Sequence, residues 1–237
     1  MQNGLSLLPC GRCSGLSTNI CWPFDGQPQA EFRGVPVREY WRPKESLFRS
    51  SDALGPVFKI TDGIAALFGV LPDGRRQLIR FLWPGALCGY LSENGRHLFE
   101  AAAITNVQTC SFARGSFDAC VAHDAAFAEA LRVEMAATFE EFGRHMTTLG
   151  QLNSVERVAD FLLGMREALE AVHAQISPLH LPIKRRQMAN YLGLRVETVS
   201  RAFNELRQRQ LIVPDGNEVM ILNLAGLAAS AGRSRPA

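Results

Sequence analysis

The 237-residue chain has no long apolar run and no concentrated set of catalytic side chains. No stretch reaches the ~18 apolar residues of a membrane-spanning helix, and residues 1–8 lack a basic segment followed by a long apolar core. Its five histidines are scattered, and no phosphate-loop glycine pattern occurs. We therefore expect a cytoplasmic protein that does not bind membranes and is not an enzyme.

Overall charge is nearly balanced, but its distribution along the chain is uneven. The whole chain has a formal net charge of +2. Residues 181–210 contain seven basic and two acidic residues, which gives a local charge of +5 and leaves −3 for the remainder. Positive charge focused in one segment is typical of a module that binds the nucleic-acid backbone.

The same segment contains the layout of a helix-turn-helix over residues 187–201. Ala189 allows two helices to cross closely, and Gly193 provides the permissive backbone of a tight turn. The apolar frame between the two helices consists of Met188, Leu192, Leu194 and Val199. A second helix over 196–208 would bury Val199, Ala202, Phe203 and Leu206 and leave Glu197, Ser200, Arg201 and Asn204 on its opposite face.

These exposed side chains match the chemistry of base recognition. Arginine pairs with guanine, glutamate accepts from the cytosine amino group, and serine suits either, so Glu197, Ser200 and Arg201 are the candidate base readers. Lys184, Arg186 and Arg195 are the candidate phosphate contacts. Residues 211–213, 214–217 and 218–222 form a strand, turn and strand pattern, which predicts a winged helix that binds double-stranded DNA.

The rest of the chain predicts an α+β protein with a β-barrel before a long helix. Short β-type runs between residues 35 and 120, separated by glycine-containing turns, favour an antiparallel barrel or sandwich. From residue 123 to 150 the pattern becomes helical, with an apolar heptad seam that predicts a homodimer. The seam residues are Met135, Phe139, Phe142, Met146 and Leu149. The predicted domains are an arm (1–30), a barrel (31–122), a dimerisation helix (123–152) and a winged helix (153–237).

The arm carries three closely spaced cysteines, Cys10, Cys13 and Cys21, with little else to order it. In a reducing compartment such a cluster indicates a metal site rather than disulfides. Four-cysteine ligation is usual for iron–sulfur clusters, so a fourth ligand would come from Cys88, Cys110 or Cys120. The spacing alone does not choose among them.

The order of arm, barrel, long helix and winged helix resembles the Crp/Fnr superfamily of bacterial transcription regulators, with residues 190–201 similar to the Fnr-branch recognition motif. The resemblance implies a cyclic-nucleotide-binding-like jelly roll, and it implies that Glu197, Ser200 and Arg201 read a TTGAT half-site. The arm resembles that of Fnr-type and FnrN-type oxygen regulators. In those proteins, three arm cysteines and a barrel cysteine, matched here by Cys110 and not by Cys88 or Cys120, bind an oxygen-labile [4Fe-4S] cluster.

Further expectations follow from this resemblance. The cluster would promote the DNA-binding dimer under low oxygen, and the turn at residues 72–76 is a candidate contact for RNA polymerase. Glu100 and Ala101 stand where cyclic-nucleotide-binding members have an Arg–Ser pair, and a carboxylate would repel the phosphate, so no cyclic nucleotide is expected. Arg195 replaces a helix-capping threonine and cannot accept the free amide protons there.

Other functions would use the same cysteines. A regulator of this family could sense nitric oxide or thiol oxidation, or hold a structural zinc ion. A redox enzyme that uses the arm cysteines, with the winged helix as a docking domain, is the third reading. The absence of a catalytic constellation in the sequence disfavours the enzyme.

Overall fold

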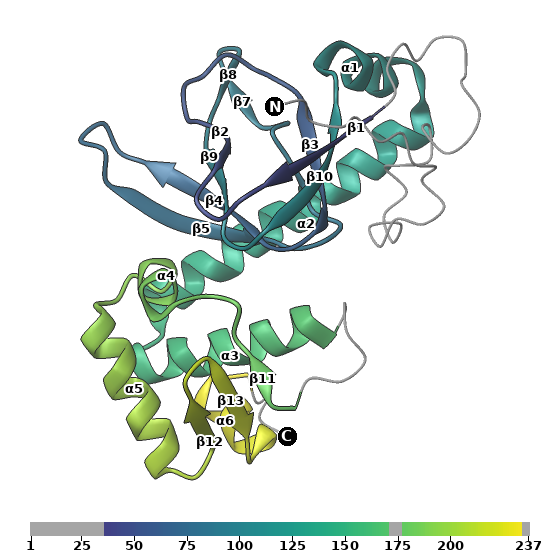
Figure 1. Cartoon of the computed structure of the whole chain (residues 1–237). Helices are drawn as coiled ribbons and strands as arrows, with labels where there is room; N and C mark the ends of the chain where they lie inside the picture. The colour runs from purple at the N-terminus through teal and green to yellow at the C-terminus, as the bar shows by residue number, and fades with distance from the viewer. Residues whose placement is uncertain (1–35, 171–176, 234–237) are drawn as a thin grey trace. The chain divides into compact units, whose positions relative to one another are not determined.

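The computed structural model describes residues 36–170 and 177–233. The chain divides into two compact units between Phe142 and Gly143, and each unit is described by itself. Together they contain the predicted parts: a strand-rich unit, a long helix and a helical unit with a small sheet (Figure 1). Among the described helices, none is long and apolar enough to cross a membrane.

The first unit is built on two four-stranded antiparallel sheets. One has the order β1-β10-β3-β6 and the other β2-β9-β4-β5, with a separate hairpin β7-β8. The bounds are β1 Val37–Trp41, β2 Ser46–Phe48, β3 Val57–Asp62, β4 Ala65–Val70, β5 Arg76–Leu82, β6 Leu87–Cys88, β7 Ser92–Glu93, β8 Arg96–His97, β9 Glu100–Ala103 and β10 Val107–Phe112. Strands β1 and β2 are edge strands, and a cleft of about 980 Å3 opens along them.

Apolar side chains from both sheets meet in a shared interior. Phe58 and Ile60 from β3 pack with Leu67 from β4 and Leu82 from β5 in one buried cluster. The turn between β3 and β4 requires glycine at position 63, where φ is +75° and a Cβ atom would lie 1.9 Å from the Asn106 carbonyl oxygen. The barrel core is thus built from the short β-type runs that the sequence predicted around residues 57–60, 64–71 and 77–82.

A second apolar cluster lies on the outer face of the β1-β10-β3-β6 sheet. It joins Val57, Leu87 and Phe112 of that sheet to Phe117 and Cys120 of helix α1 (Arg114–His123) and to Phe127 and Leu131 of helix α2 (Ala125–Gln151). Sequence analysis did not predict α1, because this short helix follows β10 directly, has no side-chain N-cap and has glycine in its first turn. It also missed the short strands β2, β6, β7 and β8.

Helix α2 spans 27 residues, close to the predicted range. Within the first unit, the side of α2 that faces the barrel is apolar at the start of the helix and polar further along. Phe127 and Leu131 are followed by Thr138, which is 3% exposed. Arg80 of β5 reaches this face: its Nε lies 2.7 Å from Glu141 Oε2, and its Nη1 donates to Thr138 Oγ1 at 3.0 Å. A buried arginine thus ties the barrel to the long helix.

The second unit is a winged helix-turn-helix. After α3 (Ser154–Glu170) come β11 (Leu179–His180), α4 (Arg185–Tyr191), α5 (Val196–Gln208), β12 (Ile212–Asp215), β13 (Glu218–Ile221) and α6 (Leu224–Ser230). The predicted helix over 196–208 is confirmed, and the predicted wing is present as β12 and β13. The sheet has the order β11-β13-β12, so β11 adds a strand that the sequence did not predict.

Candidate nucleic-acid interface and candidate cluster site

The turn between α4 and α5 is built as the sequence predicted. Gly193 has a φ of +62°, and the Leu194 amide donates to the Ala189 carbonyl at 2.9 Å. Ala189 is 3% exposed at the crossing of the two helices, and Met188, Leu192 and Val199 are fully buried beside it. Leu194 is half-buried rather than buried. A larger residue at 189 would separate α4 from α5.

A residue that sequence analysis missed holds this turn in place. Arg157 of α3 donates from Nη1 to the Leu192 carbonyl at 3.0 Å, from Nη2 to the Leu149 carbonyl at 2.7 Å, and from Nε to the Leu152 carbonyl at 2.8 Å. Its guanidinium satisfies carbonyls at the ends of α2 and α4. No spacing signal distinguishes this arginine from a surface arginine, because its role depends on backbone carbonyls, one of them 35 residues away at Leu192.

The predicted recognition face of α5 is exposed, with Glu197, Ser200, Arg201 and Asn204 outside and Val199, Ala202, Phe203 and Leu206 buried. Arg201 Nη2 donates to Thr198 Oγ1 at 3.2 Å, which holds the guanidinium along the helix. Ser200 Oγ donates to the Val196 carbonyl at 3.0 Å, so its lone pairs stay available to an incoming donor. The face therefore presents one acid, one hydroxyl and one guanidinium.

The predicted phosphate contacts lie where α4 and α5 begin. Lys184 and Arg195 are the N-cap residues of the two helices, and both are exposed, as is Arg186. At the start of α4 the Lys184 amide donates to Gln187 Oε1 at 2.7 Å. Helix N-termini favour anions, and these cations add to that effect. Arg185 has a different role: its guanidinium lies 3.3 Å from the centroid of the Phe203 ring, and burial lowers its pKa.

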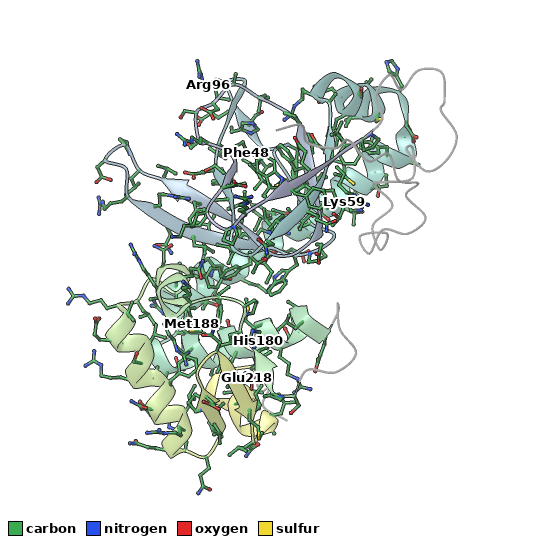
Figure 2. All side chains as sticks on the ribbon, in the orientation of Figure 1. Phe48, Lys59, Arg96, His180, Met188 and Glu218 are labelled. Carbon is green, nitrogen blue, oxygen red and sulfur yellow. The ribbon has the colours of Figure 1, made fainter. Side chains whose placement is uncertain are left out.

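The wing carries the opposite charge. Residues 210–232 include no lysine or arginine, whereas Asp215 and Glu218 are exposed at the hairpin. Figure 2 shows His180 and Glu218 on neighbouring strands, with Nδ1 and Oε1 3.7 Å apart. In the described part of the second unit, the candidate phosphate contacts therefore lie on α4 and at the N-terminal ends of α4 and α5, and not on the wing.

The five seam residues on α2 are not equally exposed. Phe139 and Met146 are 78% and 72% exposed, and Met135 is 44% exposed. Phe142 instead contacts Phe99 edge to face, with ring centroids 6.0 Å apart, and Leu149 is half-buried. At about 100° per residue, Phe142 and Leu149 lie on the side of the stripe nearer the inward face. Met135, Phe139 and Met146 are therefore the part of the seam that is open to a partner.

Three of the four predicted cluster ligands, Cys10, Cys13 and Cys21, lie outside the described residues. Among the residues described, no group of three or more His, Cys, Asp or Glu side chains is arranged to hold a metal ion. Cys110 is half-buried on β10, opposite Arg38 of β1. Among the described residues β1 is the first strand, and it pairs with β10, the strand that carries Cys110.

The two other cysteines of the described barrel unit are less suited to ligation. Cys88 is 2% exposed inside the barrel, and burial raises its pKa to about 12. Cys120 is fully buried in α1, and burial, followed by the charge of Asp124, raises its pKa to about 11. The thiolate is the form that binds metal. Cys110 therefore fits the fourth position better than either.

Glu100 and Ala101, which stand where an Arg–Ser pair was expected in cyclic-nucleotide-binding relatives, lie on β9. Glu100 accepts from Ser46 Oγ at 3.1 Å and lies 2.9 Å from Arg76 Nη2, while Ala101 is fully buried. An interior cavity lined in part by Phe48 and Phe99 holds only about 10 Å3, room for one water molecule.

Comparisons with known proteins agree with this architecture. Residues 38–124 match the cyclic nucleotide-binding domain and residues 156–230 the Crp-like helix-turn-helix domain. The chain is 32% identical over 222 residues to the nitrogen fixation regulation protein FixK of Bradyrhizobium diazoefficiens (94% of this chain, 93% of the relative). It is 33% identical over 218 residues to the transcriptional activatory protein AadR of Rhodopseudomonas palustris (88% and 87%).

A solved structure shows the same fold. The structure of FixK2 from Bradyrhizobium japonicum superimposes with a TM-score of 0.76 and 28% identity, covering 86% of this chain and all of the other. These matches define a transcription regulator and not an enzyme. The chain belongs to the Crp/Fnr family, whose helix-turn-helix regulators bind DNA and dimerise.

Proposed function

We propose that this regulator responds to oxygen through a [4Fe-4S] cluster held by Cys10, Cys13, Cys21 and Cys110, and that the cluster controls homodimer binding to TTGAT-type palindromes. The observation that carries the proposal is the position of Cys110. It is half-buried on β10, beside the strand into which the three-cysteine arm leads, whereas Cys88 and Cys120 are buried thiols with raised pKa values.

The DNA-reading part of the proposal rests on α5. Arg201 would form the bidentate contact to guanine, Glu197 would accept from a cytosine amino group, and Ser200 would adapt to its neighbour. Lys184, Arg186 and Arg195 would neutralise phosphates on either side. Because the wing is acidic, we expect the salt dependence of binding to come from these helix-end cations.

The dimer would form through the exposed part of the α2 seam. Met135, Phe139 and Met146 leave apolar surface that a second copy of the helix would bury, without like charges opposing the contact. When bound, the cluster supplies an oxygen-labile group that ties the arm to the barrel. The four cysteines would then fix the arm beside β10, near the apolar cluster that α1 and the start of α2 share with the barrel.

Two partner assignments accompany the proposal. We propose that no cyclic nucleotide is used, because the Glu100 carboxylate pairs with Arg76 and Ser46 and would repel a phosphate.

We propose that the hairpin tip at residues 72–76 contacts RNA polymerase. The tip is exposed and ordered by an Arg75 to Asp73 ion pair at 2.7 Å, and AadR is named as an activatory protein.

Cysteine-to-serine variants test the ligand assignment. Anaerobically purified protein should lose iron and sulfide when Cys10, Cys13, Cys21 or Cys110 is replaced, because three thiolates leave one iron open to attack. Cys88→Ser and Cys120→Ser should keep both. Normal iron content in Cys110→Ser, together with loss of iron in Cys88→Ser, would identify Cys88 rather than Cys110 as the fourth ligand. A colourless zinc-containing protein would support the structural-zinc alternative.

A further inference from the structure

Within the second unit, the last turns of α2 pack directly against the helix-turn-helix (Figure 1). His145 and Leu149 lie one turn apart on the same side of α2. The imidazole of His145 stacks on the ring of Tyr191, the last residue of α4, with centroids 4.0 Å and planes 16° apart. A Cβ atom added at Gly193 would lie 3.5 Å from Leu149 Cδ2. These two contacts, His145 with Tyr191 and Leu149 with Gly193, form the α2–α4 joint.

Helix α3 encloses the joint from a third direction. The ring of Phe161 lies 5.8 Å from that of Tyr191, between centroids, and the Asp160 carboxylate accepts from Thr148 Oγ1 on α2 at 3.2 Å. His145 is left only 8% exposed between α3 and α4. A histidine that the sequence shows merely as one of five scattered copies is therefore a buried contact between α2 and the DNA-binding helices.

One ring nitrogen of His145 is unpaired. Its Nε2 is buried and has no hydrogen-bond partner in the part of the chain that the structure describes. A neutral imidazole has one nitrogen without a hydrogen, so this atom can stay unpaired as a bare acceptor. Protonation would place an N–H group and a positive charge in the same space with no acceptor to receive them.

The charged groups that face His145 do not compensate for such a charge. From α3, Asp160 and Arg157 act on it with opposite signs, and Asp160 already pairs with Arg233 at 2.6 Å. Burial lowers the pKa of His145, and the charge of Asp160 opposes this effect; Arg157 lowers the pKa further, and a backbone hydrogen bond with Tyr191 of α4 raises it. The neutral ring is therefore the form that fits between the three helices.

We propose that His145 is a positioning residue for DNA recognition: its neutral ring holds α4 against the end of α2, and its protonation loosens the α2–α4 joint. Helix α5 follows α4 through the turn at Gly193, so loosening at Tyr191 changes how the base-reading face is held. Acid should thus weaken sequence-specific binding more than binding to random DNA. This inference goes beyond the proposed function and involves none of the cluster cysteines.

The direction and size of the effect follow from proton linkage. Histidine has a pKa of 6.5 when released from the joint and a lower pKa within it. The contribution of His145 to the joint is therefore fully present above pH 6.5 and is lost as pH falls through and below that value. At pH 5.5 protonation favours the released form by at most about tenfold.

Hydrogen exchange in the full chain measures the joint without DNA. Wild type is compared at pH 7.5 and 5.5 with His145→Phe and His145→Gln, neither of which titrates. In wild type, acid should lower the protection factors of the Leu192 and Leu194 amides by up to about tenfold, whereas the Leu227 amide of α6 should keep its protection. Both variants should keep the protection of all three amides. His180→Gln is the matched control, because His180 belongs to the same unit but its side chain is 66% exposed.

DNA binding tests the positioning role. Anisotropy under anaerobic conditions compares a labelled duplex carrying a TTGAT palindrome with a random duplex of equal length at both pH values. Between pH 7.5 and 5.5, the ratio of specific to random affinity should fall roughly three- to tenfold more in wild type and His180→Gln than in His145→Phe. Phenylalanine keeps an aromatic ring on Tyr191, so binding at pH 7.5 should stay close to wild type.

Three results would overturn the inference. Equal acid sensitivity of the turn amides in wild type and both His145 variants would show that another group titrates. Loss of protection that includes α6 would make His145 an ordinary core residue of the unit. An affinity ratio that does not change with pH in wild type would separate the joint from recognition. If wild type does not prefer the palindrome even at pH 7.5, the proposed target site is wrong instead, and the exchange data still decide the role of His145.

Discussion

The ion-pair network between β5 and α2 makes a sharp prediction about the long helix. Arg80 is 8% exposed, and three of its nitrogens are engaged: Nε with Glu141 at 2.7 Å, Nη1 with Thr138 at 3.0 Å, and Nη2 with Glu134 at 3.9 Å. Arg80→Met would keep the volume and remove the charge. It would remove this donor from both carboxylates, whereas the Thr138 hydroxyl would keep its hydrogen bond with the Tyr90 hydroxyl at 3.2 Å.

The size of the effect follows from burial. Removing one partner of a buried ion pair costs about 3–5 kcal/mol, but Glu141 is one-third exposed and the Glu134 contact is long. We therefore expect a loss of about 2–3 kcal/mol in unfolding free energy, or roughly 4–12 °C in the melting temperature of the barrel transition. Circular dichroism and calorimetry measure it, and hydrogen exchange along α2 locates it.

The same helix supplies the control. Arg132 pairs with Glu129 on α2 at 2.5 Å, but both side chains are more than half exposed, so Arg132→Met should leave the melting temperature unchanged. Adding Glu141→Gln to Arg80→Met should restore part of the loss, because the stranded carboxylate is removed. If Arg80→Met melts no earlier than Arg132→Met, Arg80 does not tie the barrel to α2.

Three other predictions concern recognition, pH and helix order. Arg201→Ala should cost about 1–3 kcal/mol on the specific half-site and relax specificity there, whereas Lys184→Ala should weaken specific and random DNA alike in salt-dependent binding assays. Burial, and to a lesser extent the charge of Arg114, lowers the pKa of His97, whose Nε2 accepts from the Gly55 amide at 3.2 Å. Because the unfolded chain then binds a proton more readily than the folded one, the stability of the barrel should fall as pH drops through and below 6.5, and His97→Gln should flatten that slope in thermal melts. In Gly143→Ala, the added methyl group would have no atom within 4 Å, and the change removes the penalty of about 1 kcal/mol per chain for glycine inside a helix. The variant should therefore raise α2 helicity and DNA binding in air, and equal binding by both proteins would contradict this.

The winged helix was the most predictable part of the fold. Its signals are local: a small residue at the helix crossing, glycine in the turn and a period of 3.6 in α5. The exposure of Glu197, Ser200 and Arg201 follows from that period alone. The bounds of α5 agree with the prediction for the same reason.

The inward polar face of α2 was not predictable from periodicity. In the sequence, Thr138, Glu134 and Glu141 resemble a solvated face. Their inward position depends on partners far away in the chain: Arg80, which contacts all three, and Tyr90, which contacts Thr138. The sequence predicted the neighbouring apolar seam of α2. It did not predict that two of the seam residues, Phe142 and Leu149, would be half-buried. Arg157 was missed for a similar reason, because composition treats every arginine as exposed.

The central claim is that an oxygen-labile cluster controls DNA binding, and one sample can test it. The full chain is loaded anaerobically, its visible spectrum recorded, and its affinity for a labelled duplex with a TTGAT palindrome measured by fluorescence anisotropy. Air is then admitted and both measurements are repeated. The account predicts a brown protein that binds the palindrome and loses colour and specific affinity together, with Cys110→Ser colourless and weakly bound from the start. Unchanged affinity after complete bleaching, or specific binding by protein without iron, would contradict it.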